Sequence, residues 1–129
     1  MNTMSMHALN WFELPALDLD RAYTFYHTIL GGHVRMGTFG DAPLVLFDVP
    51  FKTGEAVGGA LVKRNDLKPT NDGPIIYLNC FGKLGPVVAR VTTAGGRVLV
   101  PELNLGAFGF SAIIIDSEGN KVGLISNEA

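Results

Sequence analysis

The chain has 129 residues, the size of one ordinary domain; 47% of them are hydrophobic and 17% are charged. This balance excludes a disordered chain, and a net charge of −2 without a basic run excludes the usual electrostatic footprint of a nucleic-acid or membrane-surface protein. No apolar run reaches the ~18 residues of a membrane span, the first residues lack a signal-peptide pattern, and the single cysteine, Cys80, rules out an intrachain disulfide framework. We therefore expect a cytoplasmic protein without nucleic-acid or membrane partners.

The first half of the chain predicts a strand, a helix and three more strands. Alternating residues over 10–16 indicate the first strand, and Asp18 is suited to cap the helix that follows. The buried stripe of this helix has the helical spacing and comprises Ala22, Phe25, Tyr26, Ile29 and Leu30. Gly31 and Gly32 end the helix, and strands are expected over 33–36, 43–49 and 56–63.

The second half repeats this order after a polar connection over 64–74. A strand is expected over 75–80, then a helix with Pro86 in its first turn that ends at Gly95 and Gly96. Three strands follow, over 97–100, 108–115 and 121–126.

An offset of 64 residues aligns the two halves without a gap. It pairs Gly31 with Gly95 and Gly59 with Gly123. The sequence therefore predicts one domain, 1–129, with module one over 8–63, a linker over 64–74 and module two over 75–126. The expected fold is α+β: two β-α-β-β-β modules form a curved mixed sheet around a central cleft.

Three segments resemble the vicinal oxygen chelate superfamily, which includes glyoxalase I, bleomycin-resistance proteins and extradiol dioxygenases. They are NWFELPALDLDRAYTFYHTILGG at 10–32, GPIIYLNC at 73–80 and GFSAIIIDSEGNKVGLIS at 109–126. The first is most similar to a glyoxalase-related group without an agreed reaction. The resemblance implies the glyoxalase-like fold over nearly the whole chain and, because such proteins often pair modules across an interface, a homodimer.

The resemblance also implies four metal-binding positions, occupied in metal-dependent members by His, Glu or Gln. In this chain they fall at Trp11, Ile75, Gly123 and Gly59, with Gly58 as the neighbour of the last if the register slips by one. None of these residues has a side-chain donor, so we expect no metal and no other cofactor. A different register would restore the alternative of a metal-dependent lyase or dioxygenase.

Strand periodicity places Trp11 and Glu13 on the cleft face of the first strand, and the repeat places Tyr77 and Asn79 there too. The loop 101–109 is expected to cover the ligand. The expected ligand contacts are Trp11, Tyr77, Asn79, Phe108, Gly59 and Gly123. Glu13 is the candidate catalytic residue, because a carboxylate enclosed away from water could act as a general base.

Two functional hypotheses follow from this aromatic, largely apolar pocket. The first is a metal-free, glyoxalase-related protein that binds a small organic molecule and uses Glu13 in an unknown reaction. The second is a non-catalytic protein of bleomycin-resistance type that sequesters its ligand and tolerates Glu13→Gln.

Overall fold

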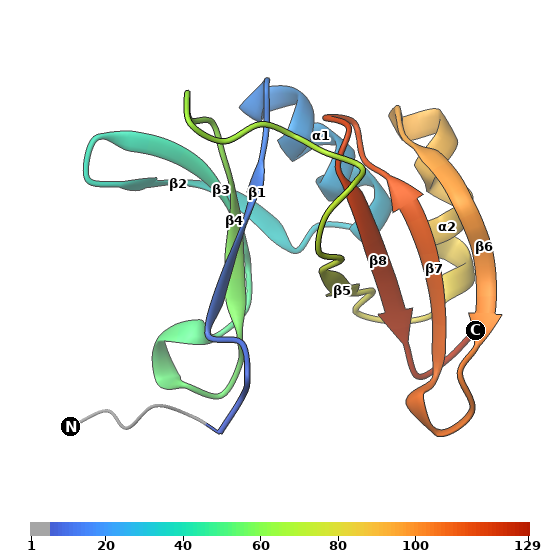
Figure 1. The fold of residues 1–129 in the computed structure, drawn as a ribbon. Coiled ribbons are helices and arrows are strands. Elements are labelled where there is room, and N and C mark those ends of the chain that lie inside the picture. Colours follow the sequence, from blue (N-terminus) through green and yellow to red (C-terminus); the bar gives the residue numbers. More distant parts are fainter. Residues whose placement is uncertain (1–5) are drawn as a thin grey trace.

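The computed structural model describes residues 6–129, which form two four-stranded sheets and two α-helices (Figure 1). In module one the elements are β1 (Trp11–Pro15), α1 (Leu19–Leu30), β2 (Val34–Phe39), β3 (Ala42–Phe47), the 3₁₀ helix η1 (Phe51–Thr53) and β4 (Gly58–Val62). In module two they are β5 (Tyr77–Asn79), α2 (Leu84–Ala94), β6 (Arg97–Asn104), the 3₁₀ helix η2 (Gly106–Phe108), β7 (Phe110–Ile115) and β8 (Lys121–Ser126). The predicted α+β fold of two β-α-β-β-β modules is confirmed.

The two sheets have the same topology. Their strand orders are β1-β4-β3-β2 and β5-β8-β7-β6. In each sheet the first and last strands of the module pair in parallel, and the other pairs are antiparallel. The sheets do not join into one continuous or closed sheet. β6 continues to Asn104, so the first four residues of the predicted loop over 101–109 are strand.

The first helix has the ends that its sequence predicts. The Asp18 carboxylate accepts a hydrogen bond from the Arg21 amide at 3.0 Å, which satisfies one of the free N–H groups of the first turn. At the other end Gly31 has φ of 67°, the left-handed conformation that glycine adopts without strain. Its buried stripe is the predicted set of five residues.

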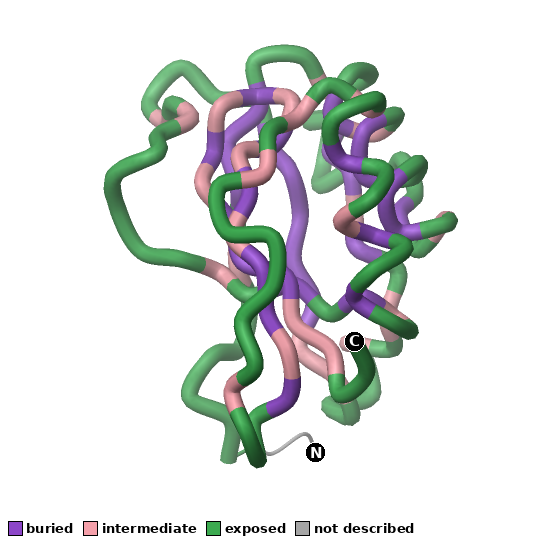
Figure 2. The backbone as a smooth tube through the Cα atoms, turned by 90° about the vertical axis from the view of Figure 1, so that its right-hand side faces the viewer, coloured by how far each residue is buried: buried purple, intermediate pink, exposed green. Residues whose placement is uncertain are grey.

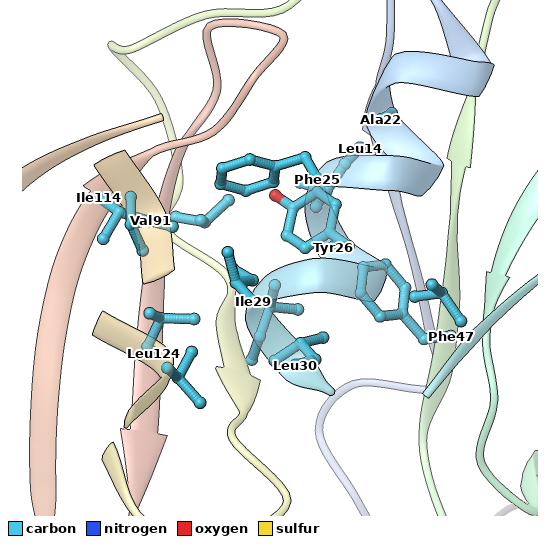
Figure 3. Close-up of a cluster of buried hydrophobic side chains, with 14 of the residues drawn as sticks. Leu14, Ala22, Phe25, Tyr26, Ile29, Leu30, Phe47, Val91, Ile114 and Leu124 are labelled. Carbon is cyan, nitrogen blue, oxygen red and sulfur yellow. The ribbon is translucent and has the colours of Figure 1, made fainter. Parts of the chain in front are cut away.

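One hydrophobic core runs through both modules. α1 packs against α2, and each helix also covers one face of its own sheet. The core therefore combines Leu14 and Phe25 of module one with Val91 and Leu124 of module two (Figure 3). Buried positions gather along the central strands and the inner sides of the helices, while the connections are mostly exposed (Figure 2). We call the other face of each sheet the helix-free face, because no α-helix within residues 6–129 covers it.

The turn between β7 and β8, residues 116–120, links the modules through polar groups. Glu118 accepts hydrogen bonds from the Leu17 and Asp18 amides, both at 2.9 Å, and pairs with Arg21 at 2.8 Å. Asn120 donates to the Pro15 carbonyl at 2.7 Å.

A second part of this linkage reaches the middle of α1. The Tyr26 hydroxyl donates to the Asp116 carboxylate at 2.6 Å, and the same carboxylate accepts three backbone amides of its own turn. The pKa of Tyr26 is raised well above its ordinary value because the hydroxyl is buried and lies beside Asp116. Within residues 6–129, every fully buried side-chain nitrogen or oxygen has a hydrogen-bond partner.

The two modules differ by one residue in strand register. Phe12 pairs with Gly59 in module one, whereas Tyr77 pairs with Gly123 in module two. The glycines are 64 residues apart but the aromatic residues are 65 apart, so the gapless alignment does not hold across all strands. A slip of one residue reverses the face of a strand position. Because of this slip, Gly59 and Gly123 lie on different faces of their sheets.

Within the part of the chain that the structure describes, neither helix is long and apolar enough to cross a membrane.

Candidate functional site

A groove of ≈ 990 Å³ lies on the helix-free face of the first sheet. Its floor is built by apolar side chains of β3 and β4, namely Leu44, Leu46 and Val62. Trp11 and Phe51 line it as well, with their rings edge to face at a centroid distance of 5.2 Å. An apolar concave surface with aromatic walls is the usual composition of a small-molecule site.

Charged side chains complete the groove lining. They are Glu13, Arg35, Lys52, Lys63 and Arg64. All the lining residues come from 11–64, so module two of the same chain does not contribute to this groove.

Glu13 lies in the groove beside Trp11, as the alternation of β1 predicts. Its carboxylate pairs with Arg64 at 3.2 Å and accepts a weak hydrogen bond from the Trp11 indole N–H at 3.5 Å. The Glu13 side chain is 36% exposed, so it is not enclosed away from water as the general-base hypothesis expected. Arg64 also pairs with Asp66 at 2.8 Å, which fixes the guanidinium over the Glu13 side of the groove.

The predicted ligand contacts of module two lie on the other sheet. Tyr77 and Gly123 are cross-strand partners on its helix-free face, where Tyr77 is 48% exposed. The side chain of Asn79 accepts a hydrogen bond from the Phe81 amide at 2.8 Å. Phe108 is 78% exposed in η2. None of these residues lines the groove of Trp11 and Glu13.

Gly59 does not face the groove. It lies on the same side of β4 as the core residue Leu61, and a Cβ atom there would overlap the ring of Phe12. Gly58 is the groove-side glycine of this strand: it pairs with Trp11, and a Cβ atom would come within 2.9 Å of Phe51. Gly58, which a register slip of one residue would select in place of Gly59, is thus the glycine that faces the site.

The side chains at the groove-side positions of the first and last strands do not fit a divalent ion. In module one β1 presents Trp11 and Glu13, and β4 presents Gly58 and Ala60 opposite them. Only Glu13 has a carboxylate, and that carboxylate is paired with Arg64. Residues 6–129 contain no group of three or more His, Cys, Asp or Glu side chains placed to hold a metal ion. A tetrahedral or octahedral site needs several such donors at one point.

Among the residues that line this groove, sequence reasoning named only Trp11 and Glu13. Phe51, Lys52 and Arg64 lie in a 3₁₀ turn and at the start of the segment assigned as a linker, where no periodic pattern marks a side chain as inward-facing. The only available signal was the short distance along the chain between these residues and the ends of β4.

Cys80 is buried, and burial raises the pKa of its thiol to about 11. The thiol therefore stays protonated at neutral pH.

Similar architecture occurs in solved structures. One is a glyoxalase/bleomycin resistance protein from Albidiferax ferrireducens T118, with a TM-score of 0.67, 13% identity and coverage of 92% of this chain and 98% of that one. A glyoxalase-related enzyme from Fulvimarina pelagi gives 0.65 at 13% identity, covering 94% and 88%. A glyoxalase I mutant from Zea mays gives 0.67 at 15% identity, and the match covers 94% of this chain but 46% of the maize chain.

No protein-family model matches the sequence, and neither does any curated protein. The fold is the glyoxalase-like fold of these structures, as the sequence motifs predicted. At these identities the likeness establishes the fold, and the function has to be argued from the groove itself.

Proposed function

We propose that this protein binds a small organic molecule in the groove of module one without a bound metal. The observation that carries the proposal is the groove itself: ≈ 990 Å³, an apolar floor, two aromatic walls and a few charged groups. The donor set argues against a metal. Metal analysis of purified protein should find no stoichiometric zinc, nickel or iron, and a full equivalent would contradict this part of the proposal.

The geometry favours binding over catalysis. Glu13 is exposed and held by Arg64, so the carboxylate is a recognition group in this proposal. The catalytic alternative keeps Glu13 as a general base, once a ligand displaces Arg64 and excludes water. Glu13→Gln separates the two, because it would abolish turnover of a substrate but leave most of the affinity for a sequestered ligand.

We also propose a homodimer. Both sheets leave one face without a helix, and these faces expose large apolar side chains such as Tyr77 and Leu103. Because the two sheets share one topology, a twofold-related copy can place its module two over this chain's module one and cover both pairs of faces at once. Tyr77, Asn79, Phe108 and Gly123 of the second copy are then the predicted contacts that approach the groove.

The binding proposal is tested with the chain's only tryptophan, Trp11, which lines the groove. A panel of small planar molecules is screened by thermal shift, and each hit is titrated against Trp11 fluorescence. We expect hits to change the emission saturably. Phe51→Ala should weaken their binding by about tenfold, because an aromatic wall is lost.

The matched control is Leu17→Ala, an exposed apolar residue outside the groove. It should leave the affinity unchanged. Hits that stabilise the protein without changing Trp11 emission, and that bind Phe51→Ala as well as wild type, would place the ligand elsewhere.

A further inference from the structure

The charge of the groove is opposite to that of the chain. The whole protein has ten Lys and Arg residues against twelve Asp and Glu, a net charge of −2. The groove lining has four cationic side chains and one acidic one. The composition of an acidic protein does not explain a cationic lining, so we use the lining charge to infer the charge of the ligand.

Two of these cations are already paired. Arg64 pairs with Glu13 and Asp66, and Arg35 lies 3.4 Å from Asp48. Lys52 and Lys63 take part in none of the ion pairs found within residues 6–129. Their charges are therefore the ones left for a ligand.

The two lysines lie toward opposite ends of the groove floor. Lys52 follows Phe51 in η1, and Phe51 packs against Gly58 at the start of β4. Lys63 follows Val62, the last residue of β4. The five residues of β4 separate them by roughly 13 Å along the strand. An elongated ligand on the apolar floor would therefore have a lysine residue of the lining near either end.

We propose that the ligand is an elongated apolar molecule with a terminal anionic group such as a carboxylate. This inference rests on the proposed binding function and specifies its ligand class. An apolar body covers the floor formed by Leu44, Leu46 and Val62, and the anion pairs with Lys52 or Lys63. A cationic group at the same place meets an excess of like charge, which selects against it.

The test uses three probes of one shape: 4-butylbenzoate, 4-butylbenzyl alcohol and 4-butylbenzylammonium. Their affinities for the full-length protein are measured by calorimetry and by Trp11 emission, at low and high salt. We expect the benzoate to bind about three- to fivefold more tightly than the alcohol, the ammonium to bind most weakly, and the difference to shrink in high salt.

Substitutions identify the end that holds the anion. Substitution of the lysine that holds the anion, by Lys52→Gln or Lys63→Gln, should reduce the preference for benzoate, and the double variant should remove it. None of these variants should change the affinity for the alcohol. Lys83→Gln, the same change at an exposed site before α2, should leave both affinities unchanged. If one lysine variant removes the preference and the other does not, the anion binds at that one end.

Equal binding of the benzoate and the alcohol would overturn the ligand class but not the binding function. A benzoate preference that survives in the Lys52→Gln/Lys63→Gln double variant would also overturn it. If none of the three probes binds, that result would contradict both the ligand class and the proposed binding function of the groove.

Discussion

Gly59 and Gly123 each lie beneath an aromatic ring of the neighbouring parallel strand. The ring of Phe12 covers Gly59 on the core side of the first sheet, and the ring of Tyr77 covers Gly123 on the open side of the second. The absence of a side chain therefore leaves room for the aromatic ring in both sheets. For Gly59 this replaces the interpretation that a metal ligand has been lost, because the residue faces the core.

These glycines make a matched pair of substitutions. Gly59→Ala should destabilise the protein by about 1–3 kcal/mol, because Phe12 is packed against Phe47 and the core and cannot move aside. Gly123→Ala should cost less than about 1 kcal/mol, because the half-exposed ring of Tyr77 can turn toward solvent. Denaturant unfolding measures both. Equal losses would show that the freedom of the ring does not decide the cost.

At the scale of elements, the 116–120 turn holds the two modules together through hydrogen bonds, and we call this turn the clamp. Glu118 is nearly inaccessible, and it satisfies amides at the start of α1 together with the Arg21 guanidinium. Burial alone would raise the pKa of Glu118, but the hydrogen bonds from Arg21, Asp18 and Ser117 outweigh it and lower the pKa below its ordinary value. The ionised carboxylate thus stabilises the folded state.

Glu118→Ala should lower the free energy of unfolding by about 2–4 kcal/mol, because buried donors lose their acceptor. The wild-type contribution is present above the ordinary carboxyl pKa of 4.5 and is lost as the pH falls through the lowered value. The wild type should therefore lose stability below pH 4.5 more steeply than the variant.

Glu55→Ala is the control for this prediction, since Glu55 is an exposed carboxylate in the corresponding turn of module one. It should change stability by less than about 0.5 kcal/mol and keep the wild-type acid sensitivity. If Glu118→Ala loses stability with acid as steeply as the wild type does, another carboxylate is responsible.

At the scale of the whole molecule, the sequence predicted the elements better than the site. Periodicity and caps identified α1 and the succession of strands and helices along the chain because these signals are local. The groove depended on side chains in irregular segments such as Phe51 and Arg64, which no local pattern specifies. The one-residue register difference between the modules misplaced Gly59, which the gapless repeat assigned to the site. Trp11 and Glu13 were found because β1 alternates regularly.

The exposed sheet faces lead to a prediction about assembly. Leu103→Glu should convert the proposed dimer to a monomer, measured by light scattering coupled to gel filtration, because a charge would enter the interface. Leu17→Glu is closely matched, since Leu17 and Leu103 are 50% and 52% exposed. Leu17 lies in the β1–α1 connection, so this variant should remain dimeric. A monomeric wild type at micromolar concentration would contradict the proposal.

The clamp also has a consequence for how the protein folds during synthesis. The Leu17 amide, the Asp18 amide and the Tyr26 hydroxyl find their acceptors 101, 100 and 90 residues further along the chain. While a ribosome makes the chain, α1 emerges long before Asp116 and Glu118 exist. Until then the amides at the start of α1 lack their acceptors, and the core side of module one is not covered by module two. Module one therefore reaches its final packing only after the β7–β8 turn has been translated.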